Sequence, residues 1–254
     1  MIDIHCHVLP MLDDGPQNET DMWAMLDMAN AEGIDYILAT PHHRSGPYRN
    51  EGKKILDAVT HYNKLIAERG YEVRLMAGQE IRIHRDLDES LGNGEAIPLN
   101  GTNYVLVEFP SDSVPDYTES LFHYLHLEGW IPVIAHPERN KAIIKDPSIL
   151  YRLVTMGAIG QVTAGSLTGA FGRKIKKLSF QLLEHHLIHI VASDAHNTGN
   201  RPFLLKKAFD EIEKKYGDDV AKEWKSRSED ILAGLPFAQD PPQEPVIKKF
   251  LGFL

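Results

Sequence analysis

The chain has 254 residues, a hydrophobic content of 43% and a formal net charge of −9, which is the balance of an ordinary globular protein. The acidic balance argues against broad nucleic-acid binding, because a cationic surface is needed to displace counterions from phosphates. A single cysteine, Cys6, excludes an internal disulfide and suits a reducing compartment. The first residues, MIDIHCH, show no signal peptide, and no apolar run reaches the roughly 20 residues of a membrane span. We therefore expect a cytoplasmic protein.

Short apolar runs alternate with longer amphipathic segments along the chain. We expect a strand over 2–5 and a helix over 19–32, with Asn18 as its N-cap and Gly33 as its stop. The following elements are, in order, strand 34–40, helix 51–69, strand 73–81, strand 103–109, helix 115–128, strand 131–136, helix 147–156, strand 158–163, helix 173–186, strand 189–194, and helices 202–216 and 218–233.

This alternation predicts about seven βα units of roughly 30 residues, joined by crossover helices into a parallel sheet. Seven units favour an α/β fold in the form of a distorted seven-stranded (βα) barrel rather than an open sheet. Because no linker divides the sequence, we expect residues 1–254 to form a single domain. Its last part, 235–254, is a Pro-rich C-terminal tail that ends in IKKFLGFL.

Histidines and carboxylates gather where the predicted strands end, which is where a βα barrel builds its active site. The first strand ends in HCH, and alternation along a strand turns His5 and His7 to one side and Cys6 to the other. The other candidates at or after strand ends are Asp13, Asp14, His42, His43, Glu80, Glu108, His136, Asp194 and His196. Each residue alone is a weak signal, but so many at one edge predict a metal site.

The number of candidates indicates more than one ion. The predicted ligands are His5, His7, Asp14, His42, Glu80, Glu108, His136, Asp194 and His196. Three divalent ions fit this set if Glu80 bridges two of them. Their +6 charge against −4 from the four carboxylates leaves +2, which attracts a dianion such as a phosphate monoester. Nitrogen and oxygen ligands without thiolate suit manganese, iron or zinc.

The remaining histidines provide the contrast. Six of them fall in predicted helices or at a strand start, away from the expected site, and are interpreted as structural or solvated: His61, His123, His126, His185, His186 and His189. The roles of His43 and His84 stay open.

Two arginines support binding of a phosphate group. Arg139 follows His136 in HPERN, and Arg201 follows His196 in HNTGNRP, so that both are expected beside the metals. A guanidinium can hold two phosphate oxygens at once, although each arginine could instead form a surface salt bridge. The segment GSLTGAFGRK at 165–174 is expected to be a flexible loop that could frame an anion, but it lacks P-loop spacing.

Three aromatic residues could shape an entrance to the site. Tyr48, Phe109 and Phe171 follow or neighbour the predicted strand ends, and core packing explains them equally well.

Together these motifs resemble the PHP (polymerase and histidinol phosphatase) superfamily. The similarity is narrower to the CpsB/CapC group of bacterial tyrosine-protein phosphatases and covers residue 3 to about residue 205. The segments that carry it are DIHCHVLPMLDDGP, ATPHH, GQEI, LVEFP, AHPERN, QVTAGSLTGAFG and ASDAHN, in this order. A glutamate at position 108, where many other PHP proteins have histidine, points to the phosphatase group.

The resemblance implies a PHP-type barrel with a trinuclear, usually manganese, centre. The ligand sets that it implies are His5, His7, Glu80 and Asp194 for one ion, Glu80, Glu108 and His136 for a second, and Asp14, His42 and His196 for the third. It also implies that Arg139 and Arg201 are catalytic and bind the substrate phosphate. The implied reaction is hydrolysis of phosphotyrosine by a metal-activated hydroxide, and the implied partner is a bacterial tyrosine autokinase that controls capsule or exopolysaccharide synthesis.

Other functions remain as alternatives. A cysteine-dependent tyrosine phosphatase is excluded, because C-x5-R would need arginine where Leu12 follows Cys6. The ligands alone allow a PHP phosphatase for small molecules such as histidinol phosphate. A PHP nuclease is disfavoured by the acidic composition. A non-catalytic module that binds a phosphoprotein is a further alternative, against which the full ligand set and both arginines count.

Overall fold

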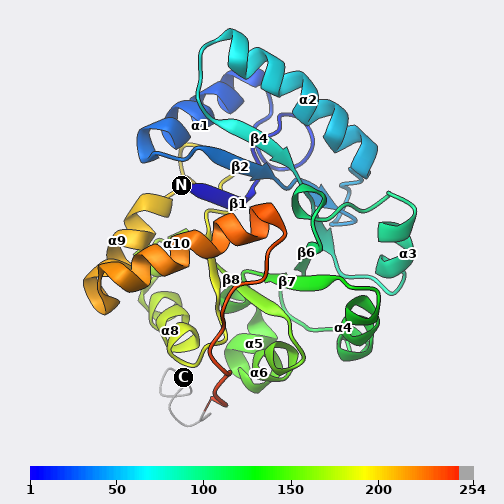
Figure 1. The fold of residues 1–254 in the computed structure, drawn as a ribbon, viewed down its shortest axis with the longest axis vertical. Helices are drawn as coiled ribbons and strands as arrows, with labels where there is room; N and C mark the ends of the chain where they lie inside the picture. Colours follow the sequence, from blue (N-terminus) through cyan, green and yellow to red (C-terminus); the bar gives the residue numbers. More distant parts are fainter. Residues whose placement is uncertain (246–254) are drawn as a thin grey trace.

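Parallel strands and the helices that connect them make up most of the structure, a computed structural model that describes residues 1–245 (Figure 1). The segment IKKFLGFL lies outside the described residues. The strands are β1 (Ile2–Cys6), β2 (Tyr36–Ala39), β3 (His42–His43), β4 (Arg74–Ala77), β5 (Glu80–Arg82), β6 (Tyr104–Glu108), β7 (Ile131–Ala135), β8 (Ile159–Thr163) and β9 (Ile190–Ala192).

These strands form two parallel sheets among the described residues. One sheet has the order β1-β2-β4, and the other has the order β3-β5-β6-β7-β8-β9. The predicted α/β alternation with parallel strands is therefore confirmed. The predicted single seven-stranded barrel is not confirmed, since the hydrogen-bonded ladder is divided between the two sheets.

The division falls just after the predicted strand 34–40 and within the predicted strand 73–81. Pro41 separates β2 from β3, and a proline has no N–H with which to continue a ladder. Gly78 and Gln79 separate β4 from β5, so the predicted strand 73–81 becomes two. A side chain at position 78 would begin 2.9 Å from Leu99, which explains the glycine there.

The helices largely follow the predicted pattern. They are α1 (Glu19–Glu32), α2 (Gly52–Glu68), α3 (Leu87–Gly92), α4 (Thr118–Leu127), α5 (Lys141–Lys145), α6 (Ser148–Thr155), α7 (Ala164–Thr168), α8 (Arg173–Glu184), α9 (Leu205–Tyr216) and α10 (Asp218–Ala233), with short 3₁₀ turns η1 (Leu99–Gly101) and η2 (Pro137–Arg139). Asn18 caps α1 by accepting from the Asp21 N–H, and Gly33 ends it in the left-handed conformation, as predicted.

The helices differ from the prediction at several places. The sequence patterns do not predict α3 or α5, and α4 begins at Thr118 rather than at 115. The segment 165–174 is mostly ordered into α7 and the start of α8, so that only 169–172 form a loop. Helix α9 begins at Leu205 rather than at the predicted residue 202, because Pro202 and Leu204, which has a left-handed backbone conformation, precede it.

Apolar side chains from both sheets converge on one inner cluster. Ile4, Leu38, Leu106, Val133 and Ile190 all contribute to it. Helix α10 packs against β1 and β9 (Figure 1). Its Ile231 is buried in the same cluster. A second, larger cluster lies between the sheets and the surrounding helices. The strands are thus covered on both sides, as expected for parallel strands.

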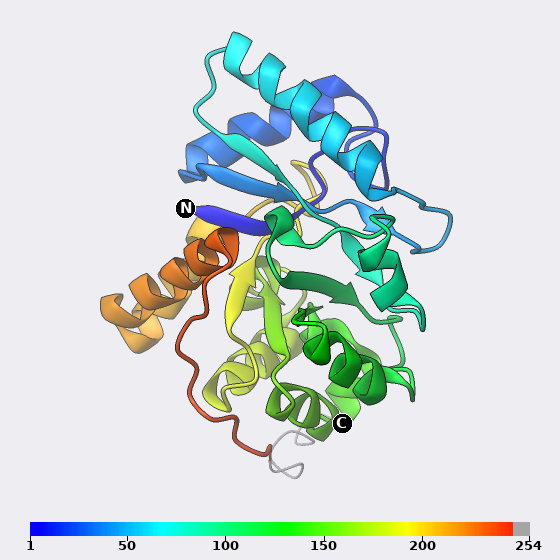
Figure 2. The same ribbon diagram turned by 45° about the vertical axis from the view of Figure 1, so that its right-hand side comes forward.

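The described part of the tail lies along the body of the protein. After α10 it runs past the strands toward the end of α8, as both ribbon views show (Figure 2). The Leu235 carbonyl accepts a hydrogen bond from Tyr104, and the Gln243 N–H donates to the His185 carbonyl.

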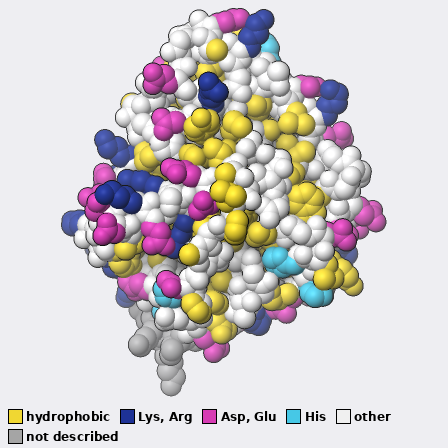
Figure 3. All heavy atoms as spheres, viewed as in Figure 1, with side chains coloured by type: hydrophobic (Ala, Val, Ile, Leu, Met, Phe, Trp, Pro, Cys, Tyr) yellow, Lys and Arg dark blue, Asp and Glu magenta, His cyan; other side chains and the backbone are white. Residues whose placement is uncertain are grey.

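The surface in Figure 3 carries interleaved basic and acidic side chains over α9 and α10. They pair with one another, as in Lys222 with Asp218 and Arg227 with Glu223. None of the described helices is both long enough and apolar enough to cross a membrane.

Candidate metal centre

The HCH segment presents its two histidines to one side, as the alternation predicts. His5 and His7 are fully buried, with their Nε2 atoms 3.2 Å apart. Cys6 lies on the other side, where its N–H donates to Thr40 and its thiol lies 3.6 Å from the Ala195 carbonyl. Burial raises the pKa of the Cys6 thiol well above its usual value, so Cys6 has the properties of a core residue and not of a nucleophile.

Register and backbone geometry bring the other strand ends to the same place. His42 in β3 pairs directly with Glu80 in β5. His136 and Asp194 follow β7 and β9, and both adopt positive φ, 34° and 53° respectively. Left-handed backbone at a non-glycine residue is unfavourable and is concentrated at functional sites. These turns aim both side chains back over the strand ends.

Glu80 lies at the centre of the cluster. Its Oε1 is 2.7 Å from His136 Nε2, and its Oε2 is 2.8 Å from His42 Nδ1. The same Oε2 lies 3.2 Å from His7 Nε2 and 3.5 Å from His5 Nε2. One carboxylate thus touches four histidines from three segments, which is the arrangement expected of a bridging ligand.

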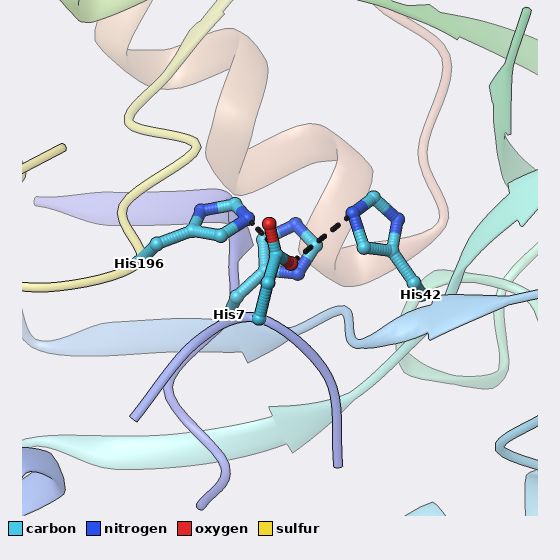
Figure 4. A group of neighbouring side chains, drawn as sticks. His7, His42 and His196 are labelled. Atoms are coloured by element: carbon cyan, nitrogen blue, oxygen red, sulfur yellow. Dashed lines mark ion pairs between the residues drawn. The ribbon is translucent and has the colours of Figure 1, made fainter. Parts of the chain in front are cut away.

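Asp14 closes the more exposed side. Its Oδ1 lies 3.4 Å from His42 Nε2 and 3.3 Å from His196 Nε2. Figure 4 shows His7, His42 and His196 converging from three separate segments, and the rings of His7 and His196 stack with centroids 3.8 Å apart.

Asp194 links the histidines to the two predicted arginines. Its Oδ1 is 3.5 Å from His5 Nε2, while its Oδ2 lies 2.5 Å from Arg139 Nη1 and 2.8 Å from Arg201 Nη2. Arg201 also reaches Asp14 at 3.5 Å. Both arginines therefore lie at the centre and not in isolated surface salt bridges.

An outer layer of polar residues orients the histidines. His7 Nδ1 is 2.6 Å from Asp13 Oδ2, and His5 Nδ1 is 2.9 Å from Gln161 Oε1. His196 Nδ1 donates to the Asp194 carbonyl. When the imidazole is neutral, each bond leaves an Nε2 lone pair directed at the centre, as in metal sites, where the outer partner fixes the ring.

Sequence reasoning missed several of these supporting residues. Gln161 lies inside β8, and its only sequence signal is a polar side chain at the middle of a short buried strand. Arg82 in β5 pairs with Glu108 at 2.9 Å, and Ser45 donates to the same oxygen. Asp3 accepts from Ser193 and is wholly buried, and this burial raises its pKa to about 6.

Attraction between the carboxylates and the nearby histidines and arginines determines the charge states of the carboxylates. Burial would raise the pKa of Glu80, but the imidazoles of His42 and His5 outweigh it and hold that pKa well below its usual value. Burial would also raise the pKa of Asp194, but the positive charges of His5 and Arg201 outweigh this effect. The pKa of Asp194 is therefore well below its usual value. Burial and the neighbouring Glu80 raise the pKa of Glu108. The carboxylates of Glu80 and Asp194 are therefore ionised at neutral pH.

The predicted ligands occur in overlapping groups whose donor atoms lie close enough to share an ion. These groups are His7, Asp14, His42 and His196; His5, His7 and Glu80; His5, His136 and Asp194; and His42, Glu80 and Glu108. Among the described residues, Glu80 Oε2, His42 Nδ1 and His196 Nε2 are buried and make no hydrogen bond of suitable geometry, although Oε2 and Nδ1 are only 2.8 Å apart. Buried polar atoms normally have partners, and lone pairs that face one another fit a divalent cation between them.

A pocket of about 190 Å³ opens beside this cluster. Its lining includes His42, Glu108, His136, Arg139 and Arg201. The guanidinium groups of Arg139 and Arg201 and the open side of the ligand cluster thus face one small cavity, which suits an anionic group.

Three other histidines lie outside the ligand cluster. His43 is buried and faces Glu95 at 3.3 Å, and His84 bonds to Ser90, so neither joins the cluster. His189 lies at the start of β9, near Arg227. Of the three aromatic candidates, Phe109 lines the pocket and stacks on Phe122, Tyr48 stacks on His42, and Phe171 lies over Arg139.

The known proteins to which this chain is similar carry the names of tyrosine-protein phosphatases. The chain is 44% identical to the tyrosine-protein phosphatase YwqE of Bacillus subtilis, over the full length of both chains. It is 32% identical to the tyrosine-protein phosphatase CpsB of Streptococcus pneumoniae, over 88% of this chain and 94% of that protein. A solved structure, from crystals of YwqE and CpsB described as unique metal-dependent tyrosine phosphatases, superposes with a TM-score of 0.94 at 43% identity and covers 97% of this chain and all of that one.

A family sequence model for capsular polysaccharide synthesis proteins of the CpsB/CapC type matches residues 1–232. This range contains every predicted ligand and both arginines of the centre described above. The chain therefore belongs to the CpsB/CapC family.

Proposed function

We propose that this protein is a metal-dependent phosphatase that hydrolyses phosphotyrosine on proteins. The observation that carries the proposal is the placement of Arg139 and Arg201 around one small pocket with the histidine–carboxylate cluster. The names of the relatives, which are tyrosine-protein phosphatases, support the same reaction.

The centre would hold three divalent ions, with manganese as the first choice and iron or zinc as others. The proposed ligands are His5, His7, Asp14, His42, Glu80, Glu108, His136, Asp194 and His196. Supporting this, His5, His7 and Glu80 form one close group, and Glu80 with Glu108 forms another, so that Glu80 is shared. Asp14, His42 and His196 belong to a third.

When bound, such ions lower the pKa of a coordinated water and polarise the phosphoryl oxygens. The side chains of the protein itself would bind the phosphoryl group of the substrate. Arg139 and Arg201 carry guanidinium groups that hold two oxygens each and stabilise the charge that builds up on the phosphoryl group. Both guanidinium groups contact the Asp194 carboxylate, which holds them at the edge of the pocket.

The fold that carries this chemistry is proposed to be one PHP-type domain over 1–254, with its strands arranged as a distorted barrel. Two contacts across the gap between the sheets support this. The His7 N–H donates to the Ala195 carbonyl, and the Asp194 N–H donates to the His5 carbonyl. Cys6 and Ala195 form a parallel bridge. The end of β1 is thereby joined to the chain that follows β9.

We further propose a cytoplasmic location and a cognate bacterial tyrosine kinase, with its substrates in capsule or exopolysaccharide synthesis, as the physiological partners. The family description, which names capsular polysaccharide synthesis, supports this setting.

The first experiment measures phosphate release from a phosphotyrosyl peptide and from histidinol phosphate. The protein is stripped with a chelator and assayed with and without added Mn²⁺, alongside His136→Ala. Metal-dependent release from the peptide that is lost in His136→Ala supports the proposal. Release from histidinol phosphate alone would keep the centre but replace the substrate. Metal binding without release from either compound would instead favour a phosphoprotein-binding module.

A further inference from the structure

Phe171 is one of the aromatic residues beside the centre to which the proposed function assigns no role. Phe171 lies in the loop 169–172 between α7 and α8, and 36% of its surface is exposed. Its ring centroid is 4.9 Å from the Arg139 guanidinium carbon. A partly exposed phenylalanine is common on protein surfaces, but this one lies against an arginine that faces the pocket.

The backbone around this ring is built to hold it in place. Gly169 and Gly172, at either end of the loop, have φ of 88° and 93°, a conformation that favours glycine. Gly165 lies under the ring, and a side chain there would begin 2.9 Å from Phe171 Cε2. The glycines of GSLTGAFG thus let the loop turn sharply and let the ring lie against α7.

A buried carboxylate ties this loop to the arginine. Glu138, in the same short turn as Arg139, is fully buried and accepts bonds from the Thr163 N–H at 3.1 Å and the Ser166 hydroxyl at 2.6 Å. Thr163 ends β8, and Ser166 lies in α7. The turn that carries Arg139 and the helix that precedes Phe171 are therefore fixed relative to each other.

We propose that Phe171 is a specificity residue, whose ring packs against the aromatic ring of the substrate while Arg139 holds its phosphate. This inference rests on the proposed phosphatase function and deepens it. The Arg139 guanidinium lies over one face of Phe171, and 36% of that side chain remains exposed. A group esterified to a phosphate held by Arg139 would meet the exposed part of this ring. An aromatic ester gains contact with that ring, whereas the short side chain of phosphoserine does not reach it. The site would thus favour aromatic over aliphatic phosphate monoesters.

The test compares Phe171→Ala and Phe171→Trp with the parent enzyme, all loaded with Mn²⁺. The substrates are a phosphotyrosyl peptide and a phosphoseryl peptide of the same sequence. Phe171→Ala should raise KM for the phosphotyrosyl peptide about three- to tenfold with little change in kcat, because an aromatic pair contributes that much to binding. Hydrolysis of the phosphoseryl peptide should not change, and Phe171→Trp should retain the preference. Tyr124→Ala, which removes an aromatic side chain that is 60% exposed on α4, is the matched control.

A binding measurement separates this inference from the proposed function. Calorimetric titration of phenylphosphonate and methylphosphonate reports the aromatic preference without turnover. If the parent prefers phenylphosphonate and Phe171→Ala loses that preference, the inference holds even where no phosphotyrosyl peptide is hydrolysed. An equal loss for both phosphonates would mean that Phe171 only positions Arg139. That result, or unchanged values for both, would overturn the inference.

Discussion

The Nδ1 atom of His7 donates to the carboxylate of Asp13 over 2.6 Å, which aims the opposite nitrogen of the ring at Glu80. Asp13 also accepts from the N–H groups of Gly15 and His42, so one buried side chain fixes two loops of the centre. Burial opposes ionisation, but the adjacent His7 outweighs it and lowers the pKa of Asp13. An ionised Asp13 makes the His7 ring a better electron donor toward a metal.

Asp13→Asn should therefore weaken Mn²⁺ binding about 10–100-fold, although Asp13 is not itself among the proposed ligands. The amide has one acceptor oxygen in place of two, so it cannot serve His7 and both backbone N–H groups. Calorimetric titration of the chelated protein with Mn²⁺ measures the effect. Asp57→Asn, which changes an exposed aspartate on α2, provides the control. Equal Mn²⁺ affinity in both variants would contradict the orienting role.

Added Mn²⁺ should stabilise the protein toward heat. A ligand that binds only the folded state contributes about 2.7 kcal/mol at 100 times its Kd, which corresponds to a rise in Tm of roughly 5–10 °C for a chain of this size. Glu80→Gln should abolish most of this rise, because Glu80 contacts four histidines and is the proposed bridging ligand. Thermal unfolding of the chelated protein, with and without Mn²⁺, gives the answer. A full Mn²⁺ response in Glu80→Gln would argue against a shared ion at this carboxylate.

Cys6→Ala should leave phosphatase activity unchanged within about twofold. The thiol is buried, its pKa is raised well above the usual value, and it faces away from the histidines. Removing the sulfur from a packed position should lower the free energy of unfolding by about 1 kcal/mol. Activity assays before and after treatment with iodoacetamide, together with urea unfolding, test both statements. Loss of activity at normal stability in Cys6→Ala would reinstate a thiol mechanism.

His189 should make the stability depend on pH. Burial and the nearby Arg227 lower the pKa of His189 to about 3, whereas in the unfolded chain it is about 6.5. Between these values the unfolded state binds a proton that the folded state does not, so stability falls as the pH falls below 6.5, by about 1.4 kcal/mol per pH unit at most.

His189→Asn should remove this part of the pH dependence, since asparagine does not titrate and its oxygen can replace Nδ1 as acceptor for the Gly160 N–H. Urea unfolding of both proteins between pH 4.5 and pH 7.5, reported as the difference at each pH, isolates the contribution of His189. Parallel pH curves for the two proteins would show that His189 is protonated as easily in the folded state as in the unfolded one.

Local sequence patterns determined the order of strands and helices, the caps at Asn18 and Gly33, and the side to which His5 and His7 turn. These follow from short-range geometry, namely the period of a strand or helix and the conformational freedom of glycine. The same patterns predicted that the histidines and carboxylates would meet, because parallel strands end at one edge.

The division of the strands and the residues that support the centre depend on contacts between distant segments of the folded chain. The ladder breaks at Pro41, just beyond the predicted strand 34–40, and at Gly78, within the predicted strand 73–81. A side chain at position 78 would begin 2.9 Å from Leu99. Gln161, Arg82 and Glu138 act on partners that are distant in the sequence, and no local pattern records those contacts. Phe171 lies against Arg139 because the buried Glu138 joins η2 to α7. A long-range contact of this kind is a property of the folded chain, since it depends on packing between segments that the sequence alone does not place.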